Sequence, residues 1–132
     1  MSRMYTLCLA GIVGLGLGVT GCGGGGGGYS GGSFDVAWSL YWAGGGLVSC
    51  SGAGVTEVDL DVQDTYTGIA YHDQFACSDN GGTSRMLPVD DYTVALRAYD
   101  VTGAQVSEWD GSRTYPIDMD VVTYLPDVIL PI

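Results

Sequence analysis

The 132-residue chain predicts an all-β fold, an antiparallel β-sandwich of immunoglobulin-like or transthyretin-like arrangement, in its last 100 residues. Three observations predict it. Apolar and polar residues alternate with a period of two in several segments, as in strands that bury one face. Turn residues recur about every 8–12 positions, and no segment has a helical period. We therefore expect one domain of about seven to nine short strands over residues 33–132.

The clearest alternation covers residues 34–42, where every even position is large and apolar. A glycine loop is expected at 43–46, and a short strand is expected after it at 47–50. Residues 55–64 alternate again, with Asp59 and Asp61 on the polar face. Further strands are expected at 69–77, 84–87, 92–99, 105–109, 114–119 and 121–130, the last one bent by Pro126. The dipeptide Asp110-Gly111 is a hairpin signal, so 114–119 should return along 105–109.

The first 21 residues predict a signal peptide. One Arg precedes the apolar run 7–19, which is too short to cross a bilayer as a helix. The run ends in Val19-Thr20-Gly21-Cys22, which resembles the lipobox of bacterial lipoproteins at every position. The resemblance implies cleavage before Cys22 and a lipid on its thiol, so membrane lipid is the expected partner. A plain secretory signal with an incidental cysteine is the alternative.

Residues 22–32 contain six consecutive glycines, Gly23 to Gly28, and predict a flexible linker between the lipid and the domain. Ten such residues reach roughly 16–19 Å. The chain is therefore expected to be exported and anchored to the cell envelope. In the lipoproteins that it resembles, Asp after the modified cysteine is the usual inner-membrane signal. Gly23 stands there instead, which favours the outer membrane of a Gram-negative cell.

Charge excludes one class of partner. After cleavage, three Arg face 15 carboxylates, a net side-chain charge of −12, and the chain has no Lys. So acidic a domain is unsuited to nucleic acid or to anionic lipid surfaces.

Two cysteines remain in the domain, Cys50 and Cys77. In an oxidising compartment an even pair predicts a disulfide. A metal or redox pair and two buried free thiols are the alternatives.

A second resemblance concerns the strand at 92–99. Leu87-Pro88-Val89-Asp90-Asp91-Tyr92-Thr93-Val94 resembles the entrance to a central strand in carboxypeptidase-regulatory-like and starch-binding-like β-sandwich domains. Asp90-Asp91 departs from the glycine that is usual there. Over residues 84–131 the resemblance implies a sandwich. A tyrosine at such a corner is expected to bond to nearby backbone.

Candidate sites are few. His72, the only histidine, is expected to be structural or at the surface, and Asp73 interrupts an apolar strand face. Carboxylates with period-two spacing are weak candidates for calcium. They lack a dedicated loop pattern, and a solvated strand face is the preferred explanation. These are Asp59, Asp61, Asp118 and Asp120.

Aromatic side chains are the other candidates. Trp38 is expected in the core against the disulfide. Trp42 and Trp109 lie near strand ends and, with Tyr41, could stack on sugars; the alternative is that they cover the edges of the core. No nucleophile, acid/base pair or cofactor motif is evident. We therefore expect a non-catalytic interaction or structural domain that takes no cofactor and has an envelope protein or a glycan as partner. A carbohydrate-binding or adhesion module, either with or without a dependence on calcium, is the alternative.

Overall fold

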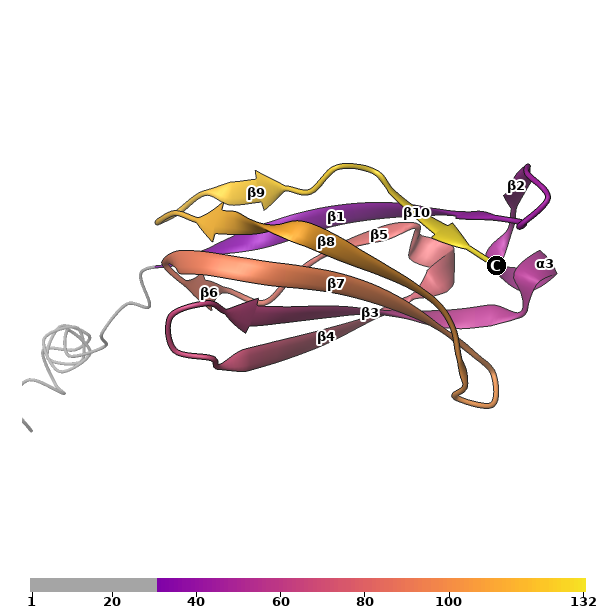
Figure 1. Ribbon diagram of the computed structural model, residues 1–132, viewed down its shortest axis with the longest axis horizontal. Helices are drawn as coiled ribbons and strands as arrows, with labels where there is room; N and C mark the ends of the chain where they lie inside the picture. Colours follow the sequence, from indigo (N-terminus) through magenta and orange to yellow (C-terminus); the bar gives the residue numbers. More distant parts are fainter. Residues whose placement is uncertain (1–30) are drawn as a thin grey trace, which may run out of the picture.

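The computed structural model describes residues 31–132. The signal peptide, Cys22 and most of the expected linker lie outside the described residues. The described part is an all-β sandwich of two sheets, which confirms the expected fold class (Figure 1). Its strands are β1 (Gly31–Tyr41), β2 (Leu47–Val48), β3 (Val55–Asp64), β4 (Ala70–Ala76), β5 (Gly81–Thr83), β6 (Leu87–Pro88), β7 (Asp90–Asp100), β8 (Gln105–Ile117), β9 (Val122–Tyr124) and β10 (Val128–Pro131). Two short helices, α3 (Cys50–Ala53) and η1 (Cys77–Asp79), flank the β3–β4 hairpin.

One sheet has four antiparallel strands in the order β4-β3-β7-β8. Its inner face carries alternating apolar residues of β3 and β7, as the period-two pattern predicts. Its outer face carries the intervening polar residues. β4 and β8 form the two edges of this sheet.

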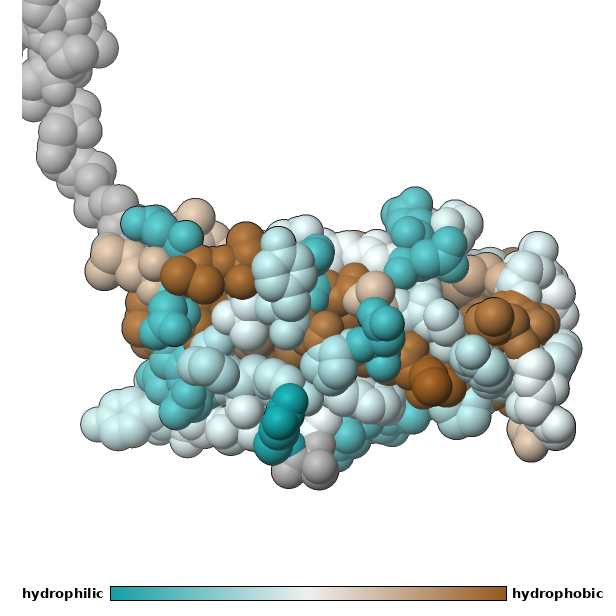
Figure 2. Space-filling view, turned by 90° about the horizontal axis from the view of Figure 1, so that it is seen from above, coloured by the Kyte–Doolittle hydropathy of each residue, from teal (hydrophilic) through white to brown (hydrophobic). Residues whose placement is uncertain are grey.

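The other sheet is built on β1. β6, β5 and β2 run antiparallel to it, whereas β9 and β10 run parallel to it. The two C-terminal strands replace the single strand expected at 121–130. Between them, the backbone N–H of Leu125 donates to the carbonyl of Asp35 at 2.9 Å. The parallel pairing differs from the antiparallel arrangement expected, and it ties the end of the chain to its first strand. Figure 2 looks down on this side of the sandwich, where brown apolar surface is divided by polar side chains.

The core lies between the sheets and is closed by aromatic residues. Phe34 makes edge-to-face contacts with Tyr92 and Tyr115, with ring centroids 6.1 and 6.4 Å apart. Trp38 is buried, as expected, and its indole N–H donates to the carbonyl of Cys77 at 3.2 Å.

The Cys50–Cys77 disulfide is present, with the two Cα atoms 5.9 Å apart. It joins α3, which precedes β3, to η1, which follows β4. The disulfide therefore closes the open end of the β3–β4 hairpin, and Trp38 of β1 packs beside the disulfide.

The tyrosine corner is formed as expected. The Tyr92 hydroxyl donates to the carbonyl of Pro88 at 2.8 Å, across the connection between β6 and β7. Burial raises the pKa of Tyr92 to about 12. The phenol therefore stays protonated, and the hydrogen bond holds at any physiological pH.

The expected hairpin at Asp110-Gly111 is wrong. β8 runs without reversal through these residues, and its pairing with β7 shifts register between Gly111 and Tyr115. The dipeptide therefore lies at the start of a bulge in β8. Glycine suits position 111 because a Cβ there would meet the rings of Trp109 and Tyr115.

Gly31 and Gly32 belong to β1 rather than to a linker. They pair with Pro88 and Leu87, and a Cβ at Gly32 would overlap the carbonyl oxygens of Asp118 and Val121. Glycine is needed here because another backbone passes too close for a side chain.

Candidate functional site

The aromatic residues predicted to bind sugars do not form one surface. Trp42 is 47% exposed in the loop after β1. Trp109 is half-buried and packs against the core, and Tyr41 is half-buried in β1. Within residues 31–132 the close ring pairs involve other aromatics, which are Phe34, Trp38, Tyr71, Phe75, Tyr92 and Tyr115.

Among residues 31–132, the most exposed aromatic side chains are two that the sequence analysis did not propose as a site. Tyr66, in the β3–β4 turn, is 87% exposed, and Tyr124 in β9 is 75% exposed. They lie on different sheets. A planar aromatic strip, the geometry a sugar-binding surface needs, is therefore not assembled by the described residues.

The predicted carboxylates separate into two places. Asp118 and Asp120 are exposed in the connection from β8 to β9, beside Gly31. Asp59 and Asp61 share the outer face of the four-stranded sheet, as the spacing predicts. Across residues 31–132, no group of three or more His, Cys, Asp or Glu side chains is arranged so that it could hold a metal ion.

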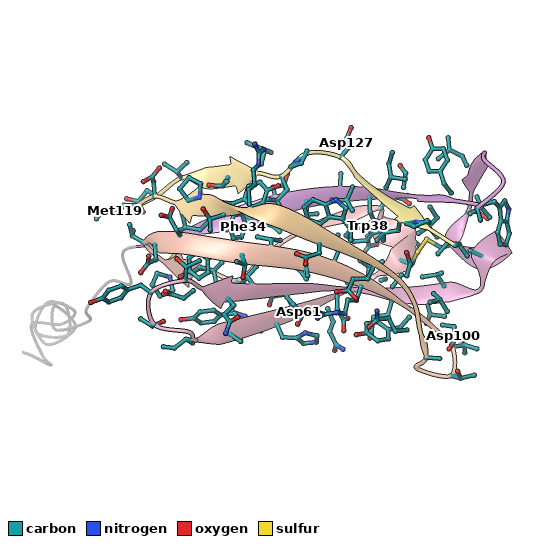
Figure 3. All side chains as sticks on the ribbon, in the orientation of Figure 1. Phe34, Trp38, Asp61, Asp100, Met119 and Asp127 are labelled. Carbon is teal, nitrogen blue, oxygen red and sulfur yellow. A yellow bond between two sulfur atoms is a disulfide. The ribbon has the colours of Figure 1, made fainter. Side chains whose placement is uncertain are left out.

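Charged residues concentrate on the outer face of the four-stranded sheet, where the strand register sets them in rows. One row places His72, Asp61, Ala95 and Asp110 side by side on β4, β3, β7 and β8. The next row places Gln74, Asp59, Arg97 and Glu108 in the same order. Figure 3 labels Asp61 on this side of the sheet.

His72 lies between the two aspartates of β3. Its Nδ1 is 2.8 Å from Asp61 Oδ1, and its Nε2 is 3.4 Å from Asp59 Oδ2. The hydrogen bond to Asp61, with the nearby charge of Asp59, raises the pKa of His72 above 6.5, although partial burial opposes the shift. The ring therefore fills the space between the carboxylates.

Arg97 makes the other ion pairs of this face. Its guanidinium binds Asp61 at 2.5 Å and Glu108 at 3.3 Å, which links β3, β7 and β8. A hollow of about 470 Å³ is lined in part by the three residues of this link and by Ala95 and Asp110. Arg97 and His72 thus satisfy Asp61 from both sides.

Asp59 differs from the solvated residue that the sequence predicts. Only 4% of it is exposed. Burial raises its pKa, opposed by His72 and reinforced by the carboxylates of Glu57 and Asp61. Within the described chain its Oδ1 has no hydrogen-bond partner. Burying a carboxylate oxygen without a hydrogen-bond donor costs free energy, so the burial of Asp59 Oδ1 is unusual.

Asp73, the other unusual residue, has a structural partner. Its carboxylate accepts hydrogen bonds from Nε and the backbone N–H of Arg85, at 2.9 and 3.1 Å. Arg85 also donates to the carbonyl of His72. The pair covers the edge of β4, which explains a carboxylate on an otherwise apolar strand face.

Comparisons with known proteins give no family. No family model matches the chain, and no curated protein matches it. Among solved structures it is similar to a leucine-rich repeat protein from Bacteroides thetaiotaomicron, with 15% identity and a TM-score of 0.46. The match covers 80% of this chain and 14% of that one. In residues 31–132, no helix has the length and hydropathy to span a membrane.

Proposed function

We propose that the protein is a cell-envelope lipoprotein, anchored through acylated Cys22, whose β-sandwich is a non-catalytic interaction domain. The single observation that carries the proposal is the sequence Val19-Thr20-Gly21-Cys22 after a short apolar run. Two or more acyl chains on one cysteine hold a protein firmly on a membrane, whereas one chain holds it marginally.

The fold is consistent with export. Disulfides persist outside the cytoplasm and are rare inside it, and the domain contains the Cys50–Cys77 bond. The start of β1 and the C-terminus lie at opposite ends of the sandwich (Figure 1). An anchor at Cys22 would leave both sheet faces free to meet partners.

The absence of a catalytic role is part of the proposal, and the outer face supports it. Its closest carboxylates, Asp59 and Asp61, both contact the imidazole of His72. A glycosidase needs room for the scissile bond of a bound sugar between its two carboxylates, and here a side chain fills that space. His72 and Arg97 act as ion-pair partners that hold neighbouring strands.

Membrane fractionation tests the proposal. Cys22→Ser should move the protein from the membrane fraction to the soluble exported fraction, because the acyl chains are lost. Cys8→Ser is the matched control, since that cysteine lies in the expected signal peptide. Membrane association that is unchanged by Cys22→Ser would refute lipid anchoring.

A further inference from the structure

Three connections meet at the end of the sandwich where β1 begins (Figure 1). They are the β3–β4 turn, residues 65–69, the segment around β6, residues 86–89, and the β8–β9 connection, residues 118–121. We call these three segments the near loops.

Backbone pairing joins the near loops into one end surface. The N–H of Thr65 donates to the carbonyl of Asp91 at 2.9 Å, which ties the β3–β4 turn to the start of β7. Gly31, the first residue of β1, pairs with Pro88 of β6, and its carbonyl accepts from the N–H of Asp120 at 2.8 Å. The chain therefore enters the domain in the middle of the near loops.

Each near loop exposes two large apolar or aromatic side chains. They are Tyr66 and Ile69, Met86 and Val89, and Met119 and Val121. These six are nearly half of the thirteen exposed side chains of this kind in residues 31–132, and Figure 3 labels Met119 among them. Turns are usually built from small and polar residues, so apolar side chains gathered on three neighbouring connections indicate a binding surface.

The length of chain before β1 indicates what this surface meets. Cys22 precedes Gly31 by nine residues, and nine residues span at most about 32 Å even when fully extended. The 11 residues of β1 extend about 36 Å in the opposite direction, along the sandwich. A lipid on Cys22 would therefore hold the near loops, rather than the far end of the domain, beside the membrane.

Charge restricts the kind of lipid surface. The near loops contain no Lys or Arg, and their only charged residues are Asp118 and Asp120. Anionic headgroups would be repelled, whereas zwitterionic headgroups have no net charge and let apolar side chains enter. Tyr66, which is 87% exposed, has an apolar ring and a polar hydroxyl, a combination that suits the boundary between headgroups and acyl chains.

We propose that the near loops dock on the zwitterionic lipid surface to which Cys22 anchors the chain. Met86, Val89, Met119 and Val121 enter the boundary between headgroups and acyl chains, and Tyr66 lies at the level of the headgroups. The proposal rests on the lipid anchor proposed above and names the surface that holds the domain. Docking at this end leaves the outer faces of both sheets free for a partner.

The test uses the acylated protein, reconstituted in phosphatidylcholine vesicles, with a fluorophore on one introduced thiol. Val89→Cys supplies that thiol in a near loop, because Cys50 and Cys77 form the disulfide and Cys22 is acylated. Val101→Cys is the matched control, since Val101 is exposed in the β7–β8 turn at the other end of the sandwich (Figure 1). We expect nitroxides on the acyl chains to quench the label at residue 89 about threefold or more strongly than the label at residue 101.

Variants of the labelled protein test the contribution of the apolar side chains. Met86→Ser combined with Met119→Ser should lower the quenching of the label at residue 89 by about twofold or more. Leu47→Ser combined with Ile129→Ser is the matched control, because both side chains are exposed outside the near loops, and it should leave the quenching unchanged. If Val89→Cys does not fold, Val121→Cys takes its place.

A second lipid composition tests the role of charge. Phosphatidylglycerol added to the vesicles should weaken the quenching, because its headgroup repels Asp118 and Asp120. Stronger quenching with phosphatidylglycerol would overturn the assignment to a zwitterionic surface.

Equal quenching at residues 89 and 101 would overturn the proposal. Crosslinking between the Val89→Cys thiols of two copies, without quenching by lipid nitroxides, would also overturn it and would indicate that a second copy covers the near loops. Flotation of the same samples separates docking from anchoring. Protein that does not float with the vesicles overturns the anchor and the docking together, whereas protein that floats with an unquenched label overturns the docking alone.

Discussion

Reduction of the Cys50–Cys77 disulfide should destabilise the domain strongly. The bond closes a loop with a sequence separation of 27. By the chain-entropy model, a loop of this length stabilises the folded state by about 3.5 kcal/mol, because it restricts the unfolded chain. For a domain of this size, we expect the melting temperature to fall by roughly 15–25 °C.

The assay is thermal and urea unfolding followed by far-ultraviolet circular dichroism, with and without a phosphine reductant. Cys50→Ala is the matched variant, because Cys50 is half-buried whereas Cys77 is fully buried in the core. The variant and the reduced protein should agree to within about 1 kcal/mol. A loss below about 1 kcal/mol in both would refute the reasoning, since the hairpin ends would then be held by other contacts.

Three further predictions follow from single sites. Tyr92→Phe removes the hydrogen bond to Pro88 and should cost about 1 kcal/mol in urea unfolding; no change would show that the corner is held by packing alone. Gly32→Ala should lower the free energy of unfolding by about 1–3 kcal/mol, because the added Cβ meets backbone oxygens. A Cβ at Gly44 meets nothing within 4 Å, so the control Gly44→Ala should lower it by less than about 0.5 kcal/mol. The imidazole of His72 should titrate above pH 6.5 in proton NMR. The stability that its ion pairs contribute is then present below pH 6.5 and is lost as pH rises through the pKa of the folded state. A measured pKa at or below 6.5 would contradict the ion pairs.

The sequence predicted most of the fold because its strands bury one face. Alternation located β1, β3 and β7 to within a few residues, and the buried rows fell where the even positions placed them. Cysteine count and compartment predicted the disulfide. The Leu-Pro-turn-Tyr pattern predicted the hydrogen bond of Tyr92.

The parts that were missed depend on which strands are neighbours. Asp110-Gly111 has the composition of a hairpin turn, but the same residues serve a bulge when the strand continues. Gly31-Gly32 has the composition of a linker, but the close passage of the β8–β9 connection requires glycine there. Neither distinction can be made without the partner strand.

The candidate site was missed for the same reason. Asp59 and Asp61 were predicted on one face correctly, but their environment depends on β4 and β7. His72 lies directly opposite Asp61 only because of the β3–β4 register. The one available signal was the presence of His72 and Arg97 at polar-face positions of neighbouring strands, which would have indicated cross-strand ion pairs.

The central claim is that a lipid on Cys22 ties this acidic sandwich to a membrane. Mass spectrometry of the native protein, extracted from membranes and digested, tests it most directly. The account predicts an N-terminal peptide that begins at Cys22 and carries a diacylglycerol on sulfur. An N-terminal peptide that begins at Met1, or one that begins at Cys22 with a free thiol, would contradict it.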